Sequence, residues 1–183
     1  MIQELLITFA WIALGVFYCN GSEWAIHKYI LHRLGRKKKS FWRFHMGHHR
    51  LAKRNNFIDP EYIYFEYNER ELIGVILLVA AHIPVIWISP VLFLTILFAG
   101  ISYLVIHRCS HKNINWAKKY VPWHWDHHMG PRKAVEANWC ITFPLFDIIM
   151  GTRVKYLGTK EYYLDLARRS NKRMKEIKNE KVI

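Results

Sequence analysis

Histidine is the side chain best suited to chemistry in this sequence, and its spacing follows a pattern. The chain has eleven histidines in 183 residues, and ten of them fall into four short groups. The groups are His27 and His32; His45, His48 and His49; His107 and His111; and His124, His127 and His128. Neutral imidazole is a common ligand of transition metals, and one first-row ion binds about four to six ligands. Ten imidazoles therefore predict a site for two metal ions, built from four separate segments.

The spacing within each group indicates how the imidazoles would be presented. An α-helix turns by about 100° per residue, so positions i, i+3 and i+4 share a face. Each group of three is then expected to present its imidazoles in one direction, and His107 and His111 to share a face. His27 and His32 differ, because positions i and i+5 lie about 140° apart on a regular helix. We expect either a distorted helix end there, which Gly35 favours, or binding to two different ions.

The residue types narrow the chemistry of this predicted site. Zinc hydrolases place a base beside the ligands, as in H-E-x-x-H, and structural zinc sites rely on cysteine. The sequence contains no H-E-x-x-H, and Cys19, Cys109 and Cys140 are widely spaced. Two imidazole-bound redox metals favour iron and O2 chemistry on a lipid. His82 stands alone beside Pro84 and is left out of the metal set; it either lines a substrate cavity or bonds a backbone carbonyl freed near Pro84.

Three apolar runs must position the histidines. They cover residues 2–19, 72–88 and 91–106. The first reaches about 27 Å, just enough to cross a bilayer core, so a re-entrant segment stays open as an alternative. It lacks a basic leading region and a cleavage site, which predicts an uncleaved span. Asn20-Gly21-Ser22 is expected to loosen the helix after it, and Ser89-Pro90 to make a tight hairpin of the other two runs.

The positive charges are segregated from the apolar runs. The chain carries 27 Lys and Arg, none before Lys28 and none between Arg70 and Arg108. This distribution is typical of a multi-pass membrane protein and argues against nucleic-acid binding. It predicts that the ten grouped histidines lie at the cytoplasmic ends of the apolar runs. We therefore expect one all-α domain over residues 1–183, an integral membrane helical bundle with about three transmembrane helices and a cytoplasmic His-rich helical cap. The membrane would be the bacterial inner membrane or the endoplasmic reticulum.

The four histidine groups also occur in a recognisable order with other motifs. Glu23 and Trp24 precede the first group, and a closing segment carries Ala137-Asn138-Trp139, Phe143-Pro144, Asp147 and Gly151-Thr152-Arg153. This combination resembles the fatty acid hydroxylase/sterol desaturase superfamily over most of the chain from Glu23 to Arg153. The resemblance implies an integral-membrane oxygenase or desaturase that uses O2, with the ten histidines as ligands of two iron ions and with zinc replacing iron in some purified relatives. β-Carotene hydroxylases and plasmalogen desaturases share a similar histidine pattern, so the lipid substrate stays open.

A chain with this chemistry needs electrons. It has no fused cytochrome b5 domain, so we expect a separate donor of the ferredoxin or cytochrome b5 type. A basic face is a candidate docking surface for an acidic donor, although the positive-inside rule alone explains it equally well. Its residues are Lys37, Lys38, Lys39, Arg168, Arg169 and Lys172.

Metal-bound histidines usually donate their other ring nitrogen to a carboxylate or a carbonyl. Glu23 is the best candidate, because it precedes His27 by one helical turn. Asp126 and Asn138 are further candidates, and Asp147 is a weaker one; each could equally be a helix cap or part of a surface pair. The function that follows is O2-dependent oxidation of a lipid C–H bond, most readily hydroxylation. A lipid or sterol desaturase on the same scaffold and a non-enzymatic membrane metal-binding protein are the alternatives.

Overall fold

The computed structural model describes residues 1–63 and 69–180. Within those residues the chain is helical and contains no strand, which confirms the predicted all-α class. Three helices are long and apolar enough to cross a membrane: Ile2–Leu34, Glu69–Trp87 and Pro90–Lys112. They confirm the three predicted spans: the first helix continues past its apolar run, the second begins before its run and ends one residue short of it, and the third is longer than its run at both ends. Few side chains in their most apolar stretches are buried, as expected of surfaces that face lipid.

The first span is a continuous helix and does not loosen where the sequence predicted. Helix α1 (Ile2–Ala25) runs through Asn20-Gly21-Ser22 and passes directly into a π-helix, η1 (Ile26–Leu34). The prediction was wrong because tertiary contacts hold this turn. The Asn20 amide donates to the carbonyl of Phe143 (2.6 Å) and accepts from the backbone N–H of Phe146 (3.0 Å). Gly21 leaves room for the Phe146 ring, since an added Cβ would lie 2.7 Å from Cζ of that ring.

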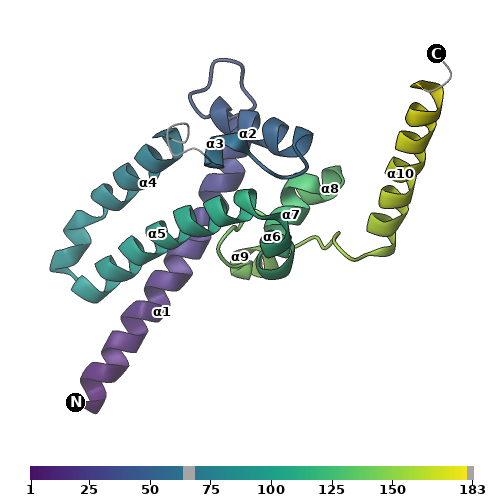
Figure 1. The fold of residues 1–183 in the computed structure, drawn as a ribbon. Helices are drawn as coiled ribbons and strands as arrows, with labels where there is room; N and C mark the ends of the chain where they lie inside the picture. The colour runs from purple at the N-terminus through teal and green to yellow at the C-terminus, as the bar shows by residue number, and fades with distance from the viewer. Residues whose placement is uncertain (64–68, 181–183) are drawn as a thin grey trace.

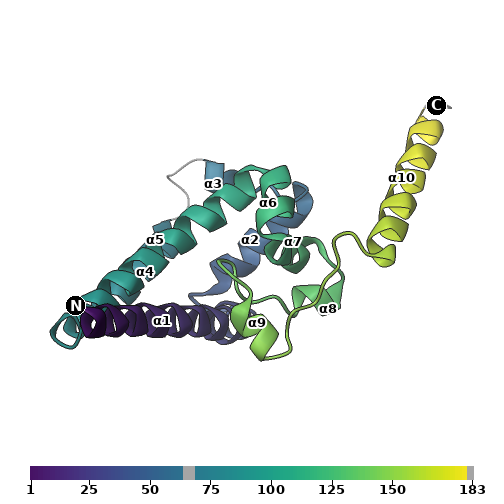
Figure 2. The same cartoon turned by 90° about the horizontal axis from the view of Figure 1, so that it is seen from below.

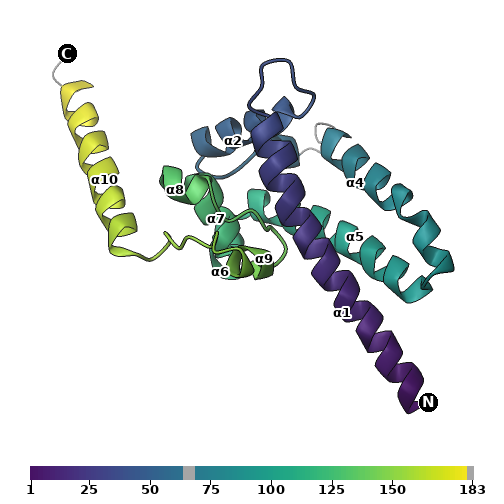
Figure 3. The ribbon, with the colours of Figure 1, turned by 180° about the vertical axis from the view of Figure 1, so that it is seen from behind.

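The other two spans form the predicted hairpin. Helix α4 (Glu69–Ala81) continues through a short 3-10 helix, η3 (Ile83–Trp87), and α5 (Pro90–Lys112) returns. Ser89 caps α5, because its hydroxyl accepts from the backbone N–H of Leu92 (3.2 Å). Helix α1 packs closely on α5 at Gly15, where an added Cβ would lie 2.7 Å from Cγ2 of Thr95. Figure 3 shows α1 crossing beside α5, with α4 on the far side of the hairpin.

Short helices gather into a cap at the ends of α1 and α5 that lie away from the N-terminus (Figures 1 and 2). The cap contains α2 (Arg43–Arg54), α3 (Pro60–Ile63), α6 (Ile114–Tyr120), α7 (Pro122–Met129), α8 (Arg132–Val135) and α9 (Leu145–Ile149). Its apolar core includes Phe57, Val121, Trp125, Met129 and Tyr156. The cytoplasmic placement of this cap and the single-domain organisation stay predictions.

The last helix, α10 (Lys160–Glu180), stands apart from the hairpin on the opposite side of the cap (Figure 1). Thr159 caps it, since its hydroxyl accepts from the backbone N–H of Tyr162 (3.3 Å). Of the predicted basic docking face, Lys37, Arg168 and Arg169 are exposed, as are the two lysines that follow Lys37. Lys172 lies outside the residues whose side chains the structure describes.

Candidate metal centre

The π-helix resolves the irregular spacing of His27 and His32. In a π-helix each N–H bonds to the carbonyl five residues earlier, and this wider turn brings residues five apart to the same side of the helix. The N–H of Gly35, for example, donates to the carbonyl of Ile30 at 3.2 Å. The rings of His27 and His32 consequently lie on one side of the helix, with centroids 5.0 Å apart. The predicted distortion is confirmed, and the two imidazoles turn towards one site.

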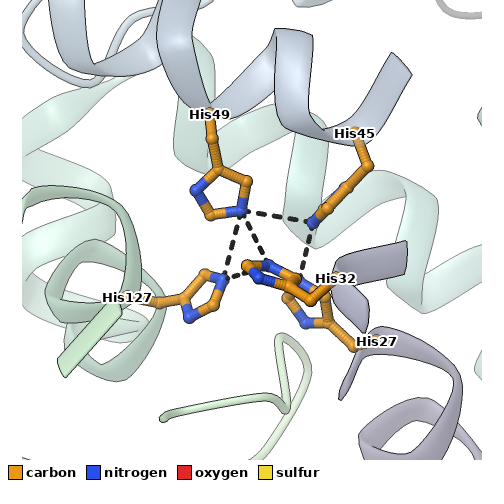
Figure 4. Close-up of side chains that lie close together, drawn as sticks. All are labelled: His27, His32, His45, His49 and His127. Carbon is orange, nitrogen blue, oxygen red and sulfur yellow. Dashed lines mark hydrogen bonds between the residues drawn. The ribbon is translucent and has the colours of Figure 1, made fainter. Parts of the chain in front are cut away.

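Five imidazoles converge at this place, which we call site 1 (Figure 4). One ligand atom from each lies within 4.8 Å of every other. Nε2 of His27 is 2.9 Å from Nε2 of His45, and Nε2 of His32 is 3.0 Å from that of His49. The fifth ring, from α7, places its Nε2 3.1 Å from that of His32. The members of site 1 are His27, His32, His45, His49 and His127.

The hydrogen bonds behind these rings show what site 1 can hold. Nδ1 of His27 lies 2.5 Å from the carbonyl of Trp139, and Nδ1 of His127 lies 2.7 Å from the carbonyl of Ala137. A carbonyl only accepts, so both Nδ1 atoms carry the proton and both Nε2 atoms present a lone pair. Lone pairs aimed at one point repel each other unless a cation lies between them. The donor set therefore fits a metal ion.

Protonation of the imidazoles does not relieve this repulsion. Burial is the main cause that lowers the pKa of His45, His49 and His127 well below the ordinary value of 6.5, and the neighbouring rings lower it further. The imidazoles are therefore neutral at physiological pH, which is the form that binds metals.

A second group, site 2, consists of His48, His107, His111 and His128. All four are buried, and their ligand atoms also lie within 4.8 Å of one another. Nε2 of His48, His107 and His128 has no hydrogen-bond partner. Buried polar atoms without partners are costly, so three of them together again fit a metal ion as their shared partner. Nε2 of His124 is 3.0 Å from Nε2 of His111, which places the tenth grouped histidine at the edge of site 2.

Helices α2 and α7 each serve both sites, and this corrects the expectation that three imidazoles point in one direction. His45 and His49 on α2 belong to site 1, whereas His48 belongs to site 2. On α7 the adjacent pair has the opposite order: the first residue, His127, lies in site 1 and the second, His128, lies in site 2. Consecutive helical residues differ by about 100°, so a helix lying between two ions can present one neighbour to each. This arrangement brings the two sites side by side.

Two carboxylates that the sequence analysis did not select bond the histidines of site 2. Oδ2 of Asp59 lies 2.5 Å from Nδ1 of His48, and Oε1 of Glu71 lies 2.6 Å from Nδ1 of His107. Glu71 also accepts from the hydroxyls of Tyr62 (2.9 Å) and Tyr103 (2.8 Å). Asp59 also accepts from the backbone N–H of Glu61 (2.9 Å) at the start of α3, so it has two roles. The sequence could have pointed to Glu71, because it is an acidic residue directly before an apolar run, where ionisable groups are often functional. The structure shows that this side chain is buried.

The selected candidates Glu23, Asp126 and Asn138 bond the backbone around the site. Glu23 accepts from the N–H of Thr142 (2.9 Å) and from that of Ile141. Asp126 accepts from the N–H of Leu157 (2.7 Å), and Asn138 from that of Val154 (2.9 Å). No histidine nitrogen is among the hydrogen-bond partners that the structure gives these three side chains.

Some of these hydrogen bonds nonetheless influence site 1, because they hold the segment of residues 137–142. Asp147, buried like Asp126, accepts from the N–H groups of Trp139 and Cys140, both at 2.8 Å. Glu23 holds the same segment two residues later. The carbonyls of Ala137 and Trp139, which fix His127 and His27, lie within it. Glu23 and Asp147 therefore position the carbonyls that orient the imidazoles.

His82 stays outside the metal sites. Its Nδ1 lies 2.7 Å from the carbonyl of Leu78, and its Nε2 lies 2.8 Å from the hydroxyl of Tyr18. The backbone N–H of His82 bonds Val79 in a 3-10 turn and thus leaves the Leu78 carbonyl to the ring. Of the two readings considered for His82, the structure favours the bond to a freed carbonyl.

We expect Asp59→Asn to weaken metal binding at site 2 and to spare site 1. The change removes the charge that orients His48, and losing such a partner typically costs about 10–100-fold in metal affinity. A chelator competition titration of the metal-loaded protein measures it. Asp165→Asn is the matched control, because Asp165 lies on α10 and accepts from the hydroxyl of Tyr156, and neither residue belongs to a metal site. Equal loss of both ions, or no loss at all, would contradict this assignment.

Comparison with known families covers most of the chain. The model of the fatty acid hydroxylase family matches residues 12–152. The matched range includes all ten grouped histidines and the carboxylates that bond them. No curated protein and no solved structure gives a significant match.

Proposed function

Because the family match extends over residues 12–152, this chain belongs to the fatty acid hydroxylase family, and we propose that it uses O2 and two iron ions to oxidise a lipid C–H bond, by hydroxylation of a fatty-acyl or related chain. The observation that carries this proposal is the pair of adjacent sites built from imidazoles. They lie where α1 and α5 enter the cap. Two metal ions at the membrane end of the cap can contact the acyl chain of a lipid in the bilayer.

The donor set fits iron. Imidazole suits iron, copper, nickel and zinc, whereas a closed structural zinc site takes four ligands with cysteine prominent. Site 1 offers five imidazoles, site 2 offers four with a fifth at its edge, and neither includes a thiolate. His27, His32, His45, His49 and His127 would hold one ion, and His48, His107, His111, His124 and His128 the other. Iron bound there would supply the activation of O2; zinc is the substitute to look for in a purified preparation.

The chain's own groups keep the centre dry and in place. Nine of the ten imidazoles are buried, and His49 is partly buried. Excluding water prevents the loss of oxidising equivalents to solvent. The backbone carbonyls of Phe57, Ala137 and Trp139 each fix one ring, and the carboxylates of Asp59 and Glu71 fix two more. Those two carboxylates also offset part of the metals' positive charge.

Charge segregation supports the proposed orientation. Lysine and arginine are absent from the start of α1 and from the whole interval between Arg70 and Arg108. By the positive-inside rule this supports a cap that lies, with its metals, on the cytoplasmic side. There, a separate ferredoxin or cytochrome b5 type donor with an acidic surface would deliver electrons to the basic cap.

Product analysis tests this function. The iron-loaded full-length protein is supplied with a reduced ferredoxin or cytochrome b5, 18O2 and, in turn, fatty acids, sterols and carotenoids in lipid nanodiscs. We expect mass spectrometry to find one labelled oxygen added to a lipid. A product that has lost two hydrogens and gained no oxygen would instead assign a desaturase. Full iron occupancy and electron delivery without any oxidised lipid would leave a metal-binding protein with no enzymatic role.

A further inference from the structure

The side chain of a tryptophan lies against site 1 and has no part in the proposed chemistry. The ring of Trp139 is 4.8 Å from that of His32, 5.4 Å from that of His127 and 5.8 Å from that of His27, measured between centroids. Trp139 is buried, and its indole N–H has no hydrogen-bond partner. An indole is among the side chains most easily oxidised by one electron. It lies here in van der Waals contact with the ligands of an oxidising centre.

A second tryptophan continues from the first. Trp24, Trp139 and Cys140 form one buried apolar cluster. A chain of hydrogen bonds also joins the two tryptophans. The indole N–H of Trp24 donates to Oγ1 of Thr152 (3.0 Å), whose hydroxyl donates to Oδ1 of Asp147 (2.7 Å). The same carboxylate oxygen accepts from the backbone N–H of Trp139 (2.8 Å). Packing and hydrogen bonds thus provide an electronic connection between the rings.

The path ends at the surface. The ring of Tyr29 contacts that of Trp24 edge-on, with centroids 5.9 Å apart, and Tyr29 is 44% exposed. Residue 29 lies about 40 Å along the helix from Ile2, which exceeds the roughly 30 Å thickness of a bilayer core. Arg33 and Arg36 are exposed beside it. A charge that reaches Tyr29 is therefore within reach of water and of soluble reductants.

We propose that Trp139, Trp24 and Tyr29 form a relay that discharges the oxidised metal centre to the surface when no substrate is bound. This relay rests on the proposed function, because it needs an O2-derived oxidant at site 1. Without a lipid C–H bond to attack, such an oxidant damages its own ligands. The aromatic path gives it a harmless source of electrons.

The step balances as one electron and one proton. Trp139 gives one electron to the oxidised centre, which is reduced by one; Trp24 refills Trp139, and Tyr29 refills Trp24. Tyr29 loses its phenolic proton to water and remains as a neutral tyrosyl radical. An external reductant, such as a thiol or the electron donor, returns one electron while water returns the proton. No covalent bond other than the O–H bond of Tyr29 breaks.

Lys28 favours Tyr29 over Trp24 as the residue on which the radical accumulates. Its ammonium lies 4.3 Å from the centroid of the Trp24 ring and 5.2 Å from that of Tyr29. A nearby cation disfavours a positively charged tryptophan radical. A tyrosyl radical that has lost its proton is neutral and carries no such penalty. Trp24 is then an intermediate, and the radical accumulates at Tyr29.

Freeze-quench electron paramagnetic resonance tests the relay. The reduced, iron-loaded full-length protein is mixed with O2 in a detergent with a fluorinated tail, which offers no oxidisable chain. We expect an organic radical that narrows when the tyrosine rings are deuterated. The signal should fall to background in Tyr29→Phe and in Trp24→Phe and return in Trp24→Tyr. It should be unchanged in Tyr163→Phe and Trp87→Phe, which alter exposed residues far from the path.

Peptide mass spectrometry on the same samples gives a second readout. Blocking the path in Trp24→Phe should raise oxygen addition at Trp139. A radical that survives in Tyr29→Phe overturns the relay, and so does one lost only in Tyr62→Phe, whose ring lies 4.8 Å from His107 in site 2. O2 consumption with no radical in the unaltered protein overturns it as well. Because Tyr29 is exposed, its variant decides the question even if Trp24→Phe fails to fold.

The failure of the relay and that of the proposed function are distinguishable. Lipid oxidation with no dependence of the radical on Tyr29 rejects the relay alone. A Tyr29 radical in a protein that oxidises none of the lipids tested rejects the function alone.

Discussion

His127→Ala is expected to leave one metal ion per chain and to abolish lipid oxidation. The Nε2 atom of His127 lies 3.1 Å from that of His32 and 3.2 Å from that of His49, so it borders the centre of site 1. Its removal also leaves the carbonyl of Ala137 without its donor. Losing a group that only orients a ligand costs about 10–100-fold, so losing a ligand should cost more than about 100-fold in activity. Metal analysis and the lipid product assay measure the two effects.

The neighbouring histidine provides a matched comparison. His128→Ala alters the next residue of α7 but removes a ligand from site 2, so it should also leave one ion, held in the other site. His82→Ala is the control, because the ring of His82 bonds Tyr18 and Leu78, which belong to neither site; it should keep both ions. If His127→Ala and His128→Ala both retained two ions, the division of α7 between two sites would be wrong.

The metal-free cap is expected to lose stability steeply as the pH falls below about 6.5. Burial holds the pKa of the six histidines of α2 and α7 well below that ordinary value. Above pH 6.5 these groups are neutral in both the folded and the unfolded state and contribute no pH dependence. Below it, only the unfolded chain takes up their protons. Each histidine then costs about 1.4 kcal/mol of stability per pH unit.

The buried carboxyl groups of Asp59 and Asp126 act in the opposite direction. Burial raises their pKa from an ordinary value of 3.8, so the folded state binds their protons first. Their effect involves fewer groups than that of the histidines. Tryptophan fluorescence and limited proteolysis of the metal-free protein across falling pH test the balance. Bound metal should shift the transition to lower pH, because protons compete with metal for the imidazoles. A cap that is more stable in acid would contradict the neutral, buried state of these rings.

The local patterns of the sequence predicted the spans and the candidate ligands. Apolar runs and the absence of charge identify three membrane helices regardless of how they pack. Helical spacing places His107 and His111 together for the same reason. The angle between His27 and His32 predicted a distortion of the helix, and the structure shows that this distortion is a π-helix. The alternative of two ions could not be rejected from the sequence, because it depends on where the other helices present their histidines.

Contacts between distant segments account for what the sequence did not predict. Glu71 and His107 are 36 residues apart, and no periodicity connects them. The turn at Asn20 looked weak because local propensity ignores the contacts that Phe143 and Phe146 make with it. The division of His48 and His49 between two sites likewise follows from the position of α2 between them, which only the packing determines.

The iron content and coordination of the fully loaded protein test the central claim most directly. Metal analysis combined with Mössbauer and X-ray absorption spectroscopy of the iron-loaded chain gives both quantities. The two sites predict two iron ions per folded chain, each surrounded by imidazole nitrogens and free of sulfur. A folded protein that binds one iron or none, or that binds iron through a cysteine, would contradict the assignment of the ten histidines to a two-ion centre.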